Sequence, residues 1–134
     1  MKTQTLRGYR GNKERMELEA MKQAVVAALE DIKARDIVVL DVAELTSMTE
    51  CMIIASADSN RQTRALAANV QDKLKEQGAE ILGVEGEDSG EWVLVDLGAV
   101  IVHIMQPAVR QYYNLEELWG GRRSGGSSQT AAGR

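Results

Sequence analysis

Cys51 and His103 are the only thiol and the only imidazole in the chain, and together they could form a nucleophile and its base. Such a pair needs a thiol that its surroundings activate. Both residues instead lie in apolar runs, and no glycine-rich turn beside Cys51 offers donors for an oxyanion. We therefore expect Cys51 to behave as a small buried residue. We expect His103 to bond to a backbone or carboxylate partner at the sheet surface.

Carboxylates are numerous, but their spacing matches no familiar metal site. One cysteine and one histidine cannot complete a structural zinc site, and segment 85–91 lacks the spacing of a calcium-binding loop. This segment could in principle hold a hard cation such as magnesium, although clustered acids between glycines are more typical of a solvated loop. Neither a Walker loop nor a glycine-rich dinucleotide motif is present, so we expect no metal and no cofactor. The acids of the segment are Glu85, Glu87, Asp88 and Glu91.

Trp92 begins an apolar run and directly follows the acidic segment. A tryptophan in this place is most often part of the core, because it offers a large apolar area. The acidic segment and the nearby Gly90 favour a second interpretation, an exposed anchor at an interface, where tryptophan and tyrosine contribute most of the binding energy. On the sequence, both interpretations stay open.

The spacing of apolar residues predicts the elements that position these groups. Apolar residues every three or four positions predict a helix from Leu18 and another after Ser59, whose pairing with Gln62 is typical of a capping box. Pro107 predicts the first turn of a final helix, where its missing N–H costs little. The order is α-β-β-α-β-β-β-α, a single α/β domain with a five-stranded mixed β-sheet and packed helices, whose last three strands form an antiparallel meander. The strands are expected near 36–42, 51–56, 80–84, 92–95 and 100–105.

Charge divides the chain into three parts. Residues 1–15 form a basic arm of charge +4, and residues 120–134 form a Gly/Ser-rich tail of charge +3 that we expect to be disordered. The net charge is −4, so the domain at residues 16–119 carries −11. Such an acidic domain repels phosphate backbones, which argues against direct sequence-specific nucleic-acid binding, and it suits a basic protein partner. The acidic composition is explained equally well if the negative charge only keeps the protein soluble.

No sequence feature indicates a membrane or an export route. The chain has no apolar run near the ~18 residues of a membrane helix. Its basic N-terminus is not followed by the apolar stretch of a secretory signal. A single cysteine cannot form an internal disulfide, which fits a reducing compartment. We therefore expect a cytoplasmic protein without membrane contact.

Several short motifs follow one another along the chain in a definite order and spacing. They are Asp36-Ile…Leu-Asp41-Val, Cys51-Met-Ile-Ile, Ser59-x-Arg-Gln, Gly83-Val-Glu-Gly, Trp92-Val-Leu-Val-Asp96-Leu-Gly, Val102-His-Ile-Met and Tyr113-Asn-Leu-Glu…Leu-Trp119. In this order and spacing they resemble the Iojap family of ribosomal silencing factors. The resemblance covers about residues 18–119. Two departures are visible: Glu50 stands where the family has an aspartate, and Ala57-Asp58 replaces a glycine-containing turn.

The resemblance implies a non-enzymatic protein with a nucleotidyltransferase-like fold. It would bind the large ribosomal subunit through a basic ribosomal protein at the intersubunit face. It would thereby block joining of the small subunit and repress translation under nutrient limitation. A homodimer is also possible, since members of the family are often dimers. The predicted partner-binding residues are Glu85, Glu87, Asp88, Trp92, Tyr113, Leu115 and Glu116.

Two other functions stay open. A metal-dependent enzyme on a nucleotidyltransferase-like scaffold could use Asp36, Asp41 and Glu50, although the phosphate-binding loop that such chemistry needs is missing. A homodimeric adaptor without a ribosomal role could pair two copies through a sheet edge.

Overall fold

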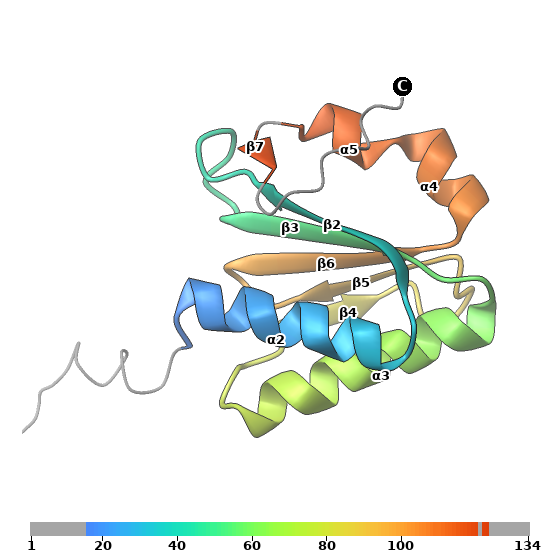
Figure 1. Ribbon diagram of the computed structural model, residues 1–134, viewed down its shortest axis with the longest axis horizontal. Coiled ribbons are helices and arrows are strands. Elements are labelled where there is room, and N and C mark those ends of the chain that lie inside the picture. The colour runs from blue at the N-terminus through green and yellow to red at the C-terminus, as the bar shows by residue number, and fades with distance from the viewer. Residues whose placement is uncertain (1–15, 121, 124–134) are drawn as a thin grey trace, which may run out of the picture.

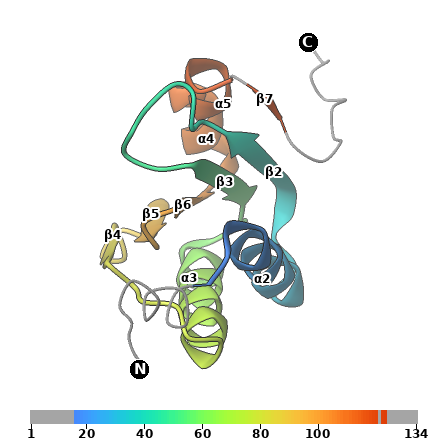
Figure 2. The same cartoon turned by 90° about the vertical axis from the view of Figure 1, so that its left-hand side faces the viewer.

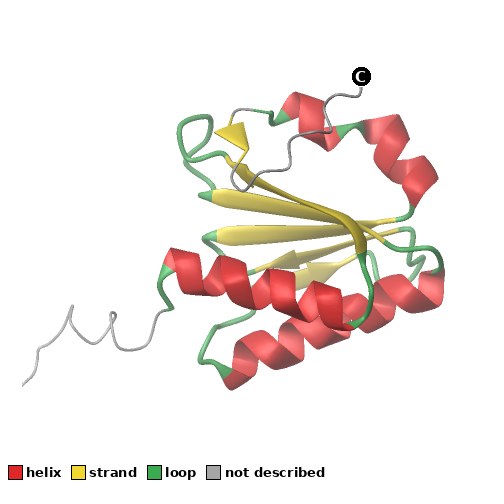
Figure 3. Cartoon of the chain, in the orientation of Figure 1, coloured by secondary structure: helices red, strands yellow, loops and turns green. Residues whose placement is uncertain are grey.

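A computed structural model of the chain describes residues 16–120 and residues 122 and 123. The predicted basic arm at residues 1–15 therefore lies outside the described residues, as does most of the predicted tail. Figures 1 and 3 show a twisted sheet between two layers of helices. The elements are α2 (Leu18–Asp31), β2 (Arg35–Asp41), β3 (Cys51–Ser56), α3 (Asn60–Glu76), β4 (Gly83–Glu85), β5 (Trp92–Asp96), β6 (Val100–Met105), α4 (Pro107–Tyr113), α5 (Leu115–Leu118) and β7 (Arg122–Arg123).

The predicted mixed sheet is confirmed, with one addition. The strand order is β4-β5-β6-β3-β2-β7. The meander β4-β5-β6 is antiparallel as expected, whereas β3 and β6 run parallel. The sixth strand, β7, pairs with Leu40 and Asp41 and comes from the segment predicted to be disordered. The likeness to nucleotidyltransferases and the domain boundaries stay predictions.

Strand alternation divides the core between the two faces of the sheet. Successive side chains of a strand point to opposite faces. On the face covered by α2 and α3, the buried strand residues include Cys51, Val93 and Val102. On the other face, Ile54 and Leu115 belong to a smaller buried cluster beneath α4 and α5. Every residue of β3 is buried, as expected for a central strand with helices on both sides.

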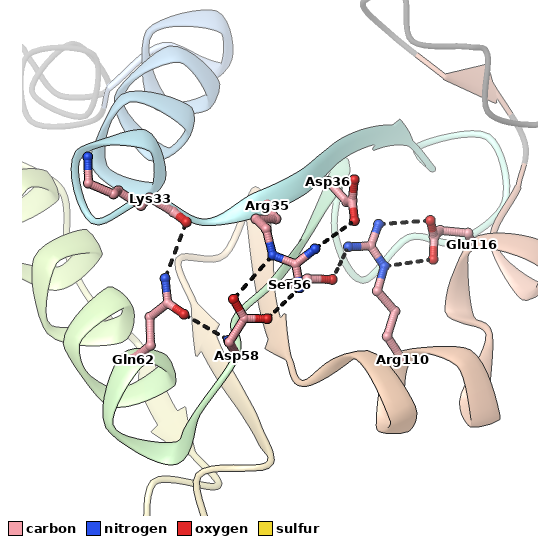
Figure 4. Close-up of polar contacts among 8 residues, drawn as sticks. All are labelled: Lys33, Arg35, Asp36, Ser56, Asp58, Gln62, Arg110 and Glu116. Atoms are coloured by element: carbon pink, nitrogen blue, oxygen red, sulfur yellow. Dashed lines mark hydrogen bonds and ion pairs between the residues drawn. The ribbon is translucent and has the colours of Figure 1, made fainter.

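The start of α3 differs from the predicted capping box. The hydroxyl of Ser59 accepts the backbone N–H of Gln62 at 3.0 Å, as expected. The side chain of Gln62, however, does not return to Ser59. Its amide oxygen accepts the N–H of Asp58 at 2.7 Å, and its amide nitrogen donates to the carbonyl of Lys33 (Figure 4). The same nitrogen also donates to the carbonyl of Ile32. Gln62 therefore ties the start of α3 to the end of α2.

The last predicted helix consists of two short helices. Pro107 occupies the first turn of α4, as predicted, where its missing N–H leaves no bond unmade. The helix is interrupted at Asn114, whose φ of +49° lies in the left-handed region, and α5 follows. None of the helices in the described part of the chain has the length and apolar character that a membrane span requires.

Candidate interaction surface

One half of the sheet has a less protected outer face. Helices α4 and α5 pack over strands β2 and β3 (Figure 2). Along β5, the residues that face α2 and α3, Val93 and Val95, are buried. The residues that point the other way, Trp92, Leu94 and Asp96, are only half-buried. The outer face of β5 is thus partly open to an incoming molecule.

Trp92 is the centre of an aromatic cluster on this face, which we define as His103, Trp92, Tyr113 and Tyr112. The ring centroids of Trp92 and Tyr113 lie 4.9 Å apart, and those of Tyr113 and Tyr112 lie 5.0 Å apart in an edge-to-face arrangement. Tyr113 is 53% exposed and Tyr112 is 81% exposed. Trp92 also packs against the smaller buried cluster. It therefore combines the two interpretations, because one part of its side chain joins the core and another part supports an exposed aromatic surface.

His103 has a different partner from the one predicted. Its Nδ1 accepts a hydrogen bond from the indole Nε1 of Trp92 at 3.0 Å, so the expected backbone or carboxylate partner is wrong. The sequence carried a signal for this pair. The two residues stand in neighbouring predicted strands, and an indole N–H needs an acceptor when it is buried.

Cys51 and His103 cannot form a catalytic pair, because they lie on opposite faces of the sheet. His103 is the register partner of Ile54, which belongs to the cluster beneath α4 and α5. Cys51 packs beneath α2 and α3. Burial also raises the pKa of the Cys51 thiol to about 11, which keeps it protonated at neutral pH.

The buried imidazole makes the stability of the fold depend on pH. Burial lowers the pKa of His103 to about 4 from an ordinary 6.5. The unfolded chain therefore takes up this proton first, and stability that is complete above pH 6.5 is lost progressively toward pH 4. Between pH 7 and pH 5, we expect His103 to lower the free energy of unfolding by about 2 kcal/mol. Urea unfolding at both pH values measures this change. His103→Asn, which does not titrate, should lack it, and an equal change in that variant would assign it to other groups.

Arg110 joins α4 and α5 to the end of β3. The side chain is buried, and its Nη1 donates to the hydroxyl of Ser56 at 2.7 Å. Its Nε and Nη2 donate to the two carboxylate oxygens of Glu116 at 3.1 and 2.9 Å (Figure 4). This bidentate pairing uses the planar fork of the guanidinium. The sequence analysis missed Arg110, and its only signal was an arginine that directly follows the apolar run Pro107-Ala-Val of a predicted helix.

Two of the predicted partner-binding residues support this surface from within. Leu115 is 9% exposed and belongs to the buried cluster beneath α5. Glu116 is engaged by Arg110. Together they hold α4 and α5, and with them Tyr113, against the sheet.

The acidic residues fall into two groups. Glu85 ends β4 opposite Leu94, so it lies on the same face as Trp92. Glu87 and Asp88 lie in the loop between β4 and β5, residues 86–91, which we call the acidic loop. Their backbone carbonyls accept hydrogen bonds from the Arg64 side chain at 2.8 and 2.7 Å. Because Arg64 belongs to α3, this part of the loop is held toward the opposite layer. The structure therefore places Glu85 on the sheet face that carries the aromatic cluster, and it places Glu87 and Asp88 at the margin.

Gly86 keeps the acidic loop close to Trp92. Its φ of +90° is one that L side chains rarely adopt, and a Cβ built there would lie 2.0 Å from the carbonyl oxygen of Trp92. The loop therefore begins directly beside the backbone at the start of β5. Any larger residue at this position would displace the backbone that carries the indole.

The three carboxylates that a metal-dependent enzyme would use are not all gathered in one place. Glu50 lies at the Asp41 end of β2, because the next residue, Cys51, pairs with Asp41. Asp36 and Asp41 lie near opposite ends of β2. The Nζ of Lys22 lies 3.4 Å from the Asp41 carboxylate. Across the described residues, no three His, Cys, Asp or Glu side chains are close enough to hold a metal ion.

The carboxyl ends of β3 and β6, where open α/β sheets usually bind ligands, are occupied by internal contacts. The side chain of Gln106, just after β6, donates to the carbonyl of Gly90 at 3.1 Å and to the side chain of Asn60. The hydroxyl of Thr63 donates to the same Gly90 carbonyl at 2.6 Å. These bonds join the starts of α3 and α4 to the acidic loop, so the side chains of Asn60, Thr63 and Gln106 stabilise the fold.

Comparisons with known proteins agree with the resemblance seen in the sequence. A model of the family described as ribosomal silencing factor during starvation matches residues 15–132. A ribosomal silencing factor from Chromobacterium violaceum is 56% identical over 108 residues, which cover 81% of this chain and 88% of that protein. A crystal structure of a protein from the same species has a TM-score of 0.77 at 52% identity, and covers 87% of this chain and 100% of that one. The chloroplastic Iojap protein of Zea mays is 37% identical over 97 residues, which cover 72% of this chain and 42% of that protein. The chain therefore belongs to the family of ribosomal silencing factors.

Proposed function

We propose that this protein represses translation by binding the large ribosomal subunit and preventing the small subunit from joining. The partner on the large subunit is a basic ribosomal protein at the intersubunit face, and repression operates under nutrient limitation. Family membership and the names of the relatives support the silencing role. The observation that carries the binding mode is the aromatic cluster on a half-open sheet face.

The chemistry of this surface suits a protein partner better than a small molecule. Tyr112 and Tyr113 present rigid rings with polar tips, and such side chains dominate the binding energy of interfaces. Trp92 supports them from below through its ring contact with Tyr113. Glu85 adds a negative charge on the same face of the sheet as Trp92. In a domain of charge −11, this arrangement favours a partner with a basic surface.

The predicted partner-binding residues then take different roles. Trp92, Tyr113 and Glu85 contact the partner. Leu115 and Glu116 hold the helices that carry Tyr113. Glu87 and Asp88, at the margin, act through long-range attraction during the approach.

Sedimentation with purified ribosomal subunits tests the proposal. The protein should sediment with the large subunit alone, and light scattering should show that it lowers the association of the two subunits. When the protein is added to a reconstituted translation system, the rate of protein synthesis should fall together with subunit association. Magnesium-dependent nucleotidyl transfer that Asp41→Asn abolishes would instead support the enzyme. Failure to bind either subunit would favour an adaptor, and sedimentation of the free protein tests the predicted homodimer.

Reversing the charges of Glu87 and Asp88 should slow association with the large subunit without unfolding the protein. Glu87 and Asp88 are exposed, and Arg64 bonds to their backbone carbonyls, so Glu87→Lys with Asp88→Lys should change stability by less than about 0.5 kcal/mol. The association rate with the large subunit should fall about threefold to tenfold at low salt, and the difference should shrink as salt is added. Stopped-flow binding measures both effects.

The control is an equal charge change elsewhere. Asp72 and Glu76 are exposed on α3, away from the aromatic cluster, and changing both to lysine alters the net charge by the same amount. If both double variants slow association equally, net charge alone steers the encounter. If neither does, the acidic loop faces away from the partner.

A further inference from the structure

The hydrogen bond between His103 and Trp92 constrains the chemistry of both side chains. An indole nitrogen can only donate. At 3.0 Å from Nε1, the Nδ1 of His103 must therefore offer a lone pair, and the ring proton of the neutral imidazole lies on Nε2. The ring centroids are 5.9 Å apart and the planes are tilted by 49°. The bond therefore fixes the direction in which the indole N–H points.

His103 itself is shielded from any partner. It is 6% exposed in the middle of β6, opposite Leu94 of β5. The next ring outward is Trp92, followed by Tyr113 at 4.9 Å and Tyr112 at 5.0 Å. Exposure therefore increases along the aromatic cluster from a buried imidazole to an open phenol. The ring contacts therefore give His103 a direct path to the exposed tyrosines through Trp92.

We propose that His103 is a positioning residue of the interface, which holds the Trp92 indole, and through it the Tyr113 ring, in the arrangement that the partner meets. The inference rests on the proposed function, since it concerns the same surface. Its physical basis is preorganisation. A side chain already held in its bound orientation loses less conformational freedom on binding, and this raises affinity without a new contact.

Two substitutions separate positioning from packing. His103→Leu keeps an apolar side chain of moderate size and removes the acceptor. His103→Asn keeps an acceptor at the atom that corresponds to Nδ1, one bond beyond Cγ. We expect His103→Leu to weaken binding to the large subunit about tenfold, as for the loss of one hydrogen bond, and His103→Asn to remain within about threefold of the original chain.

A double-mutant cycle assigns the effect to the indole. Trp92→Phe keeps an aromatic ring but has no N–H, so His103 has nothing to hold. In that background, His103→Leu should change affinity by less than about twofold. An undiminished tenfold loss there would overturn the proposal, because His103 would then act by a route other than the indole.

The free protein gives a readout that does not need the ribosome. The chain has two tryptophans, and the indole N–H of Trp119 serves as the internal reference in proton–nitrogen correlation spectra. His103→Leu should shift and broaden the Trp92 indole resonance and leave that of Trp119 in place. His103→Asn should keep the Trp92 signal sharp. An unchanged Trp92 resonance in His103→Leu would overturn the positioning role. A normal spectrum from a chain that binds no large subunit would instead overturn the proposed function.

Discussion

Trp92→Ala is expected to lower the affinity for the large ribosomal subunit by about 3 kcal/mol, roughly 150-fold, the size of an interface hot spot. The indole supports the Tyr113 ring and packs against the buried cluster, so its removal takes away a contact and lets the neighbouring ring move. Because Trp92 is half-buried, the free energy of unfolding should fall by only about 2 kcal/mol, less than for a fully buried tryptophan. Affinity is measured by sedimentation with labelled protein, and stability by urea unfolding.

Trp119→Ala is the matched control. Trp119 is also half-buried and packs against the same buried cluster, but it lies after α5 and outside the aromatic cluster. The same atoms are removed, so the loss of stability should be similar, while affinity should stay within about threefold. Equal losses of affinity in the two variants would mean that Trp92 acts through the stability of the fold and is not an anchor.

Glu116→Ala should lower the free energy of unfolding by about 3 kcal/mol, at the lower end for a broken buried ion pair. The Arg110 side chain is 10% exposed and that of Glu116 is 21% exposed. Without Glu116, the buried guanidinium would keep Ser56 as its one side-chain partner among the residues that the structure describes. The change should also weaken binding, because α4 and α5 carry Tyr113. Urea unfolding gives the stability, and the fluorescence of the free protein reports on the tryptophan environment.

Glu117→Ala tests whether the effect belongs to the buried pair. Glu117 is the next residue, is exposed and accepts a bond from the Asn114 side chain at 2.7 Å. Both glutamates lie in the first turn of α5, so any effect of the helix dipole is shared. Glu117→Ala should cost less than about 0.5 kcal/mol. A loss below about 1 kcal/mol in Glu116→Ala would show that water replaces the carboxylate at Arg110.

The local elements could be predicted from the sequence because their signals are local. A stripe of apolar residues at helical spacing marked α2 and α3, and β-branched or apolar runs marked β2, β3, β5 and β6. These patterns report which side of an element is buried, and burial is the main contribution to folding. The family resemblance added the functional class, since the order and spacing of the motifs extend over most of the domain.

The partners of the functional side chains were decided only by the tertiary structure. His103 meets Trp92 because the antiparallel register of β5 and β6 places both on one face, and a one-residue shift would separate them. Arg110 reaches Ser56 across 54 positions of sequence.

Tertiary structure also decided how the acidic residues at positions 85–88 are separated into two groups. Strand pairing places Glu85 on the sheet face of the aromatic cluster, whereas Arg64 of α3 holds the carbonyls of Glu87 and Asp88 toward the other layer. The sequence by itself determined which residues are apolar, aromatic or acidic and which elements carry them. Which of them meet depends on sheet register and on the face that each helix covers, and these are set only when distant segments pack together.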